Sequence, residues 1–215
     1  ILIDQGFRML SVFMASLLLS KISVQAVAVV VVVNVVIQKT FGLIEYFSQV
    51  IITLLGQYVA SNKENEIYIT ILSTIFINLV LGIILTTIVI YNSTIIIHFV
   101  SDDEFIITHG AVYLEIIGLG YSVYALTYAF NNILSSFGKT NICMLHSIFV
   151  NGLILFWYCV QFFLLGDCYK YSVYSILQYI ALINLIVRII GFIFLLKYFF
   201  KQIFLFFSRD SSIVR

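Results

Sequence analysis

Three ionisable side chains, those of Glu45, Glu115 and Arg188, lie inside long apolar stretches of the sequence. A charge at the centre of a membrane costs about 2.5–3.5 kcal/mol on insertion scales, so each needs a partner or water. One hypothesis is structural: Glu115 pairs with Arg188 or Lys39, or reaches the nearer membrane interface, and Arg188 is equally a partner for Glu45. The other is functional: the carboxylates face an aqueous cleft and bind a cation, a proton or a cationic substrate. We favour the second, because ionisable groups inside a membrane generally mark transport paths.

A stripe of polar residues accompanies Glu45. At 100° per residue, five polar side chains between positions 34 and 49 fall on one helical face about 22 Å long, whereas Lys39 and Tyr46 point elsewhere. Such a stripe cannot face lipid tails at low cost, so we expect it to face protein or water. Its members are Asn34, Gln38, Glu45, Ser48 and Gln49. The predicted substrate or ion pathway comprises Asn34, Gln38, Glu45, Gln49, Glu115 and Arg188.

Small residues share the helical face of Glu115. They are Gly118, Ser122, Ala125 and Ala129. A face of this kind lets two membrane helices approach closely. We therefore expect Glu115 at the mouth of a tight helix–helix seam.

Arg188 and several tyrosines are further candidates for a binding cleft. Arg188 lies well inside its own apolar run and shares a helical face with Asn184. Tyr46, Tyr121 and Tyr124 supply rings that can line a cleft and accept aromatic cations.

The sequence contains no pattern typical of catalysis or metal binding. Cys143, Cys159 and Cys168 have no zinc-like spacing, and we interpret them as small apolar residues. There is no Gly-rich phosphate loop and no Ser-His-Asp pattern. We therefore predict that the protein is not an enzyme and carries no cofactor. The net charge of +1 gives no basic field of the kind that binds nucleic acid.

The elements that must position these groups are membrane-spanning helices. Of the 215 residues, 62% are hydrophobic and only 10% are charged, whereas a soluble domain carries about a quarter charged residues. We therefore predict an all-α, polytopic membrane protein with six transmembrane helices. The apolar runs are 5–21, 24–58, 67–99, 104–136, 140–166 and 172–203. Because the chain has no proline, any bend must come from glycine or polar side chains.

Charge bias predicts how the helices are oriented. The short connections imply that neighbouring helices are antiparallel. One side then collects Arg8, Lys63, Lys139, Lys197, Lys201, Arg209 and Arg215, and the other collects Lys21, Lys170, Asp102, Asp103, Glu104 and Asp167. We expect a multi-pass protein of the cell membrane with both termini in the cytoplasm. Residues 1–203 form the predicted bundle, and 204–215 form a basic tail at the anionic membrane surface.

Several segments follow one another in a characteristic order. They are "SKISVQAVAVVVVVNVVI" (20–37), "IITLLGQYVASNKENEIYITIL" (51–72) with its Gly-Gln pair and charged loop, and 98–145 with an acidic loop, Tyr113-Leu114 and Gly138-Lys139-Thr140. Asn151 follows in the fifth run. In this order the segments resemble one bundle of the multidrug and toxic compound extrusion (MATE) transporters, and the resemblance covers nearly the whole chain.

The resemblance implies twelve helices in two six-helix bundles, with the substrate between them and a Na⁺ or H⁺ gradient as the driving force. We favour the C-terminal bundle, because Met14-Ala15-Ser16 lacks the aspartate that many first bundles carry midway along their first helix. The chain begins with Ile1 inside a helical pattern, so we expect an upstream part. The implied partners are membrane lipid, a small-molecule substrate, and the N-terminal bundle or a second copy.

The function that the resemblance implies is secondary active transport. Export of small amphiphilic or cationic compounds would proceed by alternating access, with Na⁺ or H⁺ as the coupling ion. Two alternatives stay open. One is a flippase or exporter of a lipid-linked saccharide or peptide, for which Lys39 and Arg188 are the candidate phosphate-binding cations. The other is a non-transporting membrane subunit or a degenerate half.

Overall fold

The computed structural model describes residues 2–21, 23–164 and 173–210, and every regular element within them is an α-helix. In chain order the helices are α1 (Leu2–Ser20), α2 (Val24–Ala60), α3 (Glu64–His98), α4 (Glu104–Gly118), α5 (Tyr121–Ser136), α6 (Thr140–Leu164) and α7 (Val173–Asp210). The all-α prediction is confirmed for this part of the chain. Asp167, Cys168, Lys170 and Arg215 lie outside the described residues.

The fourth predicted span, 104–136, is not one straight helix. It consists of α4 and α5, which are bent by 48° at Leu119 and Gly120. The bend falls where two glycines, Gly118 and Gly120, weaken the helix. Thr86 Oγ1 donates a hydrogen bond to the Gly118 carbonyl at 3.2 Å, so a neighbouring helix satisfies a backbone group at the break.

A second irregularity lies in α3 at Asn92, whose backbone leaves helical geometry (φ −125°, ψ 16°). The Asn92 side chain donates from Nδ2 to the Ile88 carbonyl at 3.0 Å. Both irregularities therefore occur at glycine or at a polar residue, as the absence of proline predicts.

Four of the described helices, α2, α3, α6 and α7, are long and apolar enough to cross a membrane, and the α4–α5 pair counts as a fifth span. The apolar part of α1 is shorter and runs from Met9 to Ser20. The chain is therefore a multi-pass membrane protein, while the sixth span predicted for residues 5–21 stays a prediction.

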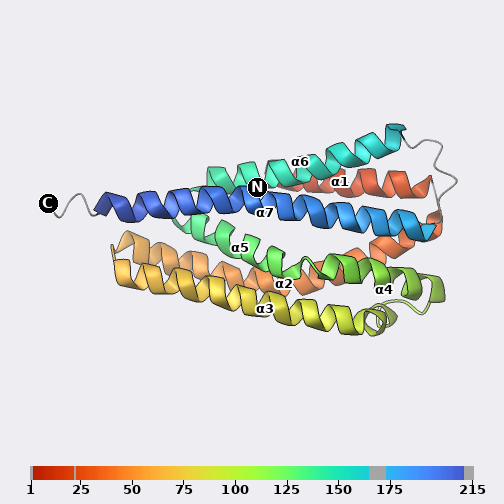
Figure 1. Cartoon of the computed structure of the whole chain (residues 1–215), viewed down its shortest axis with the longest axis horizontal. Coiled ribbons are helices and arrows are strands. Elements are labelled where there is room, and N and C mark those ends of the chain that lie inside the picture. The colour runs from red at the N-terminus through yellow and green to blue at the C-terminus, as the bar shows by residue number, and fades with distance from the viewer. Residues whose placement is uncertain (1, 22, 165–172, 211–215) are drawn as a thin grey trace.

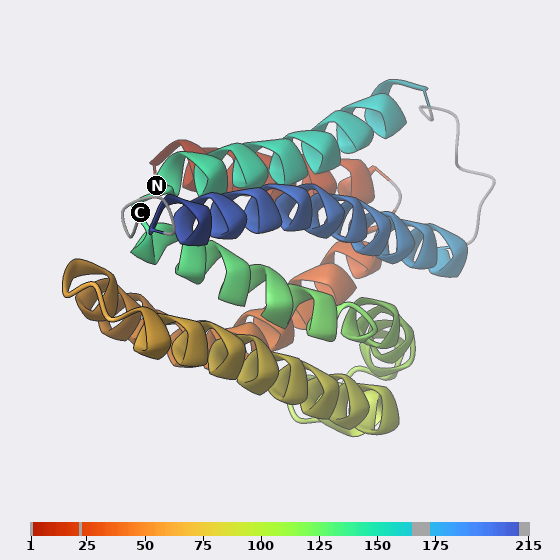
Figure 2. The same ribbon diagram turned by 60° about the vertical axis from the view of Figure 1, so that its left-hand side comes forward.

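Neighbouring helices run antiparallel, as the short connections predict (Figures 1 and 2). α2, the α4–α5 pair and α7 run in one direction, and α1, α3 and α6 run in the other. α5 packs against α2, α3, α6 and α7, whereas α4 packs against α2, α3 and α7. The bent pair thus lies between α3 on one side and α7 on the other.

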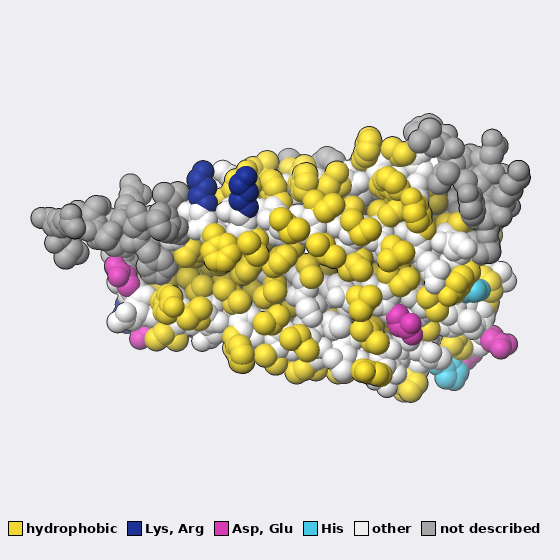
Figure 3. Space-filling model, viewed as in Figure 1, with side chains coloured by type: hydrophobic (Ala, Val, Ile, Leu, Met, Phe, Trp, Pro, Cys, Tyr) yellow, Lys and Arg dark blue, Asp and Glu magenta, His cyan; other side chains and the backbone are white. Residues whose placement is uncertain are grey.

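The described charges gather toward the two ends of the bundle. Lys63 and Lys139 lie in connections at the end toward which α7 runs, and Lys197 lies in the last part of that helix. Asp102 and Asp103 lie in the α3–α4 connection at the opposite end. Between the ends, apolar side chains dominate the visible surface, and the Lys and Arg side chains in view lie toward the C-terminal end (Figure 3). The described residues thus match the predicted charge bias.

Candidate transport site

Glu115 lies on the side of α4 that faces α3. Its Oε1 accepts a hydrogen bond from Ser93 Oγ at 2.6 Å; Ser93 is buried and Glu115 is half-buried. Ser93 directly follows Asn92, where α3 is irregular. A hydroxyl is a neutral donor, so this bond stabilises the carboxylate without cancelling its charge. Glu115 therefore remains able to bind a proton or a cation.

The predicted polar stripe of α2 divides between the interior and the outside of the bundle. Ser48 is fully buried and donates from Oγ to Asn78 Oδ1 on α3 at 2.7 Å. Glu45 is half-buried, and Gln49 Nε2 donates to its Oε1 at 3.5 Å. Of the remaining members, Asn34 is half-buried, whereas Gln38 and Gln49 are exposed. The stripe therefore borders the packed face of α2, and part of it reaches the surface of the bundle.

Aromatic rings connect α2 to α5. Phe41 stacks on Tyr124 with ring centroids 3.9 Å apart and meets Tyr121 edge-on at 4.6 Å. Tyr121 is fully buried, and its hydroxyl lies 2.8 Å from Thr40 Oγ1. The expectation that Tyr121 lines a cleft is therefore wrong, because its ring packs in the core. Tyr124 is half-buried, and Tyr46 is 70% exposed.

Arg188 lies at the middle of the apolar part of α7. The apolar part of this helix runs over 173–203, so 15 residues separate Arg188 from each end (188 − 173 and 203 − 188). Its guanidinium carbon, Cζ, lies 4.2 Å from the centroid of the Tyr124 ring. Phe41, Tyr124 and Arg188 thus form a continuous stack from α2 through α5 to α7.

The ion pairs considered for Glu115 and Arg188 do not form. Among the described residues, the acid and base that approach each other within 4.0 Å are His98 and Asp102, with Nδ1 and Oδ1 3.9 Å apart near the end of the bundle. Helix geometry explains the separation. Glu115 bonds to Ser93 on α3, and Tyr113 precedes Glu115 by two positions, or about 200° of rotation, on a helix that also packs against α7. Tyr113 therefore faces α7, while Glu115 faces α3.

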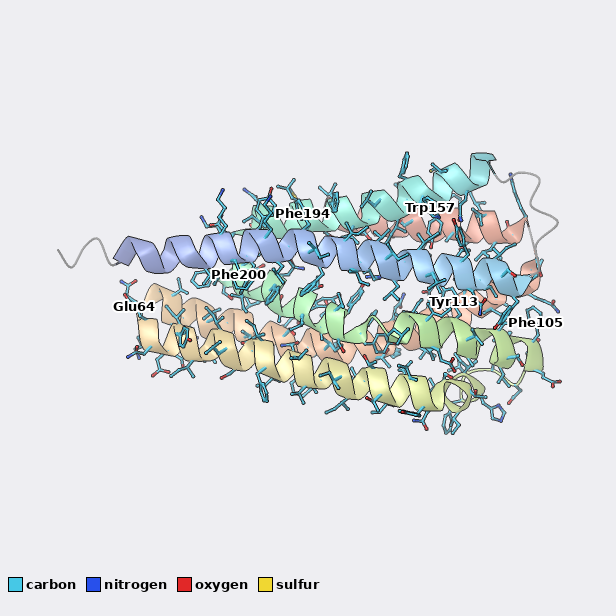
Figure 4. All side chains as sticks on the ribbon, in the orientation of Figure 1. Glu64, Phe105, Tyr113, Trp157, Phe194 and Phe200 are labelled. Carbon is cyan, nitrogen blue, oxygen red and sulfur yellow. The ribbon has the colours of Figure 1, made fainter. Side chains whose placement is uncertain are left out.

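Two tyrosine hydroxyls lie near Arg188. Asn184 and Arg188 are four residues apart on α7 and so share one helical face, and the Tyr158 hydroxyl bonds to Asn184. Tyr113 lies on α4, which packs against α7 (Figure 4). The Tyr158 hydroxyl accepts a hydrogen bond from Asn184 Nδ2 at 2.8 Å. The stack on Tyr124 is worth about 0.5–2 kcal/mol, less than the roughly 2.5–3.5 kcal/mol that a mid-membrane arginine costs. The described residues thus compensate Arg188 only in part.

Sequence reasoning identified the charged side chains but not their polar partners on α3. Ser93 and Asn78 are both buried and bind Glu115 and Ser48 respectively. A signal for them exists, because Thr74, Asn78 and Ser93 lie within about 100° of one another on a helical wheel. This buried polar face is hard to recognise in a long apolar helix, because Ser73, Thr87 and Thr94 are polar as well but lie exposed on other sides.

The small residues of the bent pair lie against α3, as expected for a close seam. A Cβ atom added to Gly82 on α3 would lie 2.7 Å from the Ser122 Cα atom, and one added to Gly118 would lie 2.6 Å from Val89 Cγ1. Thr86 Oγ1 lies 3.2 Å from Ser122 Oγ across the same seam. α3 and α5 therefore approach closely on the side of the bundle that holds Glu115.

The helices and the intramembrane polar groups define a multi-pass α-helical membrane protein of the transporter type. The family model MatE matches residues 2–160, most of the chain. The chain therefore belongs to the MATE family of transporters. Comparison with curated proteins and with solved structures gave no significant match.

Proposed function

We propose that the chain is one bundle, the C-terminal one, of a secondary active transporter that exports small amphiphilic or cationic compounds. Two bundles would move about a central site by alternating access, and entry of Na⁺ or H⁺ would drive export. The second bundle is the N-terminal half of the same protein or a second copy of this chain. Membership of the MATE family supports the transporter class.

One observation carries the proposal: both candidate carboxylates have neutral partners. Glu115 accepts a hydrogen bond from a serine hydroxyl at 2.6 Å, and Glu45 accepts one from a glutamine amide at 3.5 Å. A carboxylate locked in an ion pair would already be neutralised. These two instead keep a charge that H⁺ or Na⁺ can neutralise, which suits ion coupling.

The polar residues of α2 suit the wall of the cleft. Asn34, Gln38 and Gln49 are half-buried or exposed, so they would face the other bundle rather than the core. Exposed apolar side chains elsewhere, such as Phe76 and Ile193, suit contact with membrane lipid. We place Arg188 on the same pathway, from the opposite side of α5.

The experiment is dye efflux from vesicles that contain the protein and carry an imposed H⁺ or Na⁺ gradient. Export of ethidium should follow the gradient. The double variant Glu45→Gln/Glu115→Gln should lower gradient-dependent export by about tenfold or more, because no charge remains for the ion to neutralise. Glu66→Gln, at an exposed position near the start of α3, is the matched control and should leave export unchanged. Intact coupled export in the double variant would refute the assigned roles.

The orientation follows from the same reasoning about charge. We propose that the end carrying Lys63, Lys139 and Lys197 lies in the cytoplasm of a cell-membrane protein, together with both termini. In intact cells, a cysteine introduced at Lys139 should not react with an impermeant maleimide added outside, and it should react once the membrane is permeabilised. A cysteine at Asp102 should react from outside.

A flippase for a lipid-linked saccharide is the second candidate, favoured by the incompletely compensated charge of Arg188. Lys39 is exposed and forms no described contact with Arg188. Binding of a lipid pyrophosphate that disappears when both cations are replaced would favour the flippase. Absence of any gradient-dependent flux from the native protein would favour a non-transporting subunit.

A further inference from the structure

The cluster around Arg188 is rich in hydrogen-bond donors. A guanidinium carries five N–H groups in a rigid plane, and no acceptor among the described residues bonds to those of Arg188. The oxygen of Tyr158 already accepts from Asn184 Nδ2 at 2.8 Å, so its O–H remains free to donate elsewhere. Because Asn184 and Arg188 are four residues apart on one face of α7, the donors of Arg188 and Tyr158 lie near one another in the bundle.

The contact with Tyr124 leaves these donors available. The ring lies 4.2 Å from the guanidinium carbon and interacts with the charge through its face, and the Tyr124 hydroxyl oxygen accepts no hydrogen bond from Arg188. Arginine combines a stacked ring with a bidentate edge when it binds carboxylate or phosphate. Arg188 has the ring in place and lacks the oxygens.

The surrounding helices strengthen the preference for an anion. α5 and α6 contain no Asp or Glu, and neither does the apolar part of α7 over 173–203. The intramembrane carboxylate of α4, Glu115, faces α3 and bonds to Ser93. Glu45 on α2 accepts a hydrogen bond from Gln49 on its own helix. The helices that carry Arg188, Tyr124 and Tyr158 therefore place no carboxylate beside the guanidinium, which favours an anionic group there.

We propose that Arg188, Tyr158 and Tyr113 bind the oxyanion group, carboxylate or phosphate, of an amphiphilic ligand whose apolar part lies along the Phe41–Tyr124 stack. Arg188 supplies the charge and a bidentate edge, and Tyr158 supplies an O–H donor. Arg188 is half-buried, so a ligand can reach it, whereas Tyr113 and Tyr158 are 3% and 5% exposed and form the closed end of the site. If the chain is a transporter as proposed, this site adds anionic or zwitterionic compounds to its substrates. The binding of an oxyanion itself does not depend on the proposed function.

The test is equilibrium dialysis of the full chain in phosphatidylcholine nanodiscs, with 2-naphthoate and its uncharged isostere 2-naphthamide as probes. The wild type should bind the naphthoate about tenfold more tightly than the amide. Arg188→Gln should abolish this preference, and Arg188→Lys should keep part of it, because lysine retains the charge without the fork. Lys63→Gln, which removes an exposed cation in the connection between α2 and α3, is the control and should keep the full preference.

A second variant keeps the test decisive if Arg188→Gln does not fold. Tyr158→Phe removes one O–H donor and should weaken naphthoate binding severalfold without changing amide binding. Tyr91→Phe, at a position 82% exposed on α3, is the matched control. Equal binding of the two probes by the wild type, or an unchanged preference in Arg188→Gln, would overturn the proposal. Because dialysis needs no gradient, its outcome is independent of the transport test.

Changing the lipid of the nanodisc shows whether the bound oxyanion is a lipid phosphate or the carboxylate of a free compound. Repeating the dialysis in phosphatidylglycerol nanodiscs places a lipid phosphate in competition with the probe. Naphthoate binding that falls with anionic lipid in the wild type but not in Arg188→Gln identifies a lipid phosphate at the site. Binding that is insensitive to the lipid identifies a free carboxylate compound.

Discussion

The two sides of the bent α4–α5 pair hold opposite charges in different ways. On the α3 side, Glu115 bonds to a buried serine across a seam in which two helices nearly touch. On the α7 side, Arg188 lies over the ring of Tyr124, and the Tyr158 hydroxyl bonds to Asn184, one turn before Arg188. The carboxylate on the α3 side is therefore stabilised by a short hydrogen bond in a close helix contact, whereas the guanidinium on the α7 side is stabilised by a cation–π contact.

This difference explains why acid and base coexist in one bundle without pairing. α4 stands between them, and the 200° that separates Tyr113 from Glu115 directs their side chains to opposite faces. An ion pair between Glu115 and Arg188 would stabilise both charges, but neither would then be available to bind an ion or a ligand. Separation leaves a carboxylate that can bind a cation and a guanidinium that can bind an anion in the same bundle.

The largest loss of stability is expected from a substitution in the close contact between α3 and α5. Gly82→Val should destabilise the protein by about 2–3 kcal/mol, because the added Cβ lies 2.7 Å from the backbone Cα of Ser122, which cannot move without displacing α5. The free energy of unfolding in mixed micelles, titrated with SDS, measures the change.

Gly56→Val on α2 is the control for this substitution. Nothing lies within 4 Å of a Cβ atom at Gly56, so the same residue change should leave stability nearly unaltered. Equal stability of the two variants would mean that the seam is not close-packed.

The bond between Ser93 and Glu115 has the next largest expected effect. Ser93→Ala should cost about 1.5 kcal/mol, the lower end for hydrogen bonds to charged groups. The cost should nearly vanish when Glu115 is already replaced by leucine, since the bond is then gone. A double-mutant cycle of unfolding free energies gives the coupling, and Ser73→Ala, exposed on the same helix, is the control. Zero coupling would place the carboxylate elsewhere.

Much of this arrangement could be predicted from sequence, and the exceptions have physical causes. Apolar length predicts the helices, and the absence of proline predicts bends at glycine or polar residues, as found at Gly120 and Asn92. The sequence does not show, however, which faces of two separate helices pack together, so it cannot tell whether two charges on them meet. Pairing Glu115 with Arg188 was reasonable by charge and wrong in space. Tyr121 likewise looks like a cleft residue until its Thr40 partner is known.

The ring contact on the α7 side should contribute less than the acid bond on the α3 side. A cycle of Arg188→Met with Tyr124→Leu should give a coupling of about 1 kcal/mol, within the range for partly desolvated cation–π contacts. Repeating the cycle with Tyr124→Phe should show almost none, because phenylalanine keeps the ring. A coupling above that of Ser93 with Glu115 would reverse the order proposed for the two sides.

The smallest effect is expected for the bond from Asn184 to Tyr158. Tyr158→Phe should lower the unfolding free energy by only about 0.6 kcal/mol, the average for hydrogen bonds between membrane helices. Asn184 Nδ2 also donates to the Ile180 carbonyl at 3.0 Å, so it retains a partner when the hydroxyl is removed. SDS titration alongside Tyr91→Phe checks the value. A change of this size cannot unfold the protein. Any loss of naphthoate binding in the same variant must then come from the missing donor, whereas a much larger destabilisation would mean that Tyr158 mainly supports the packing of α6 on α7.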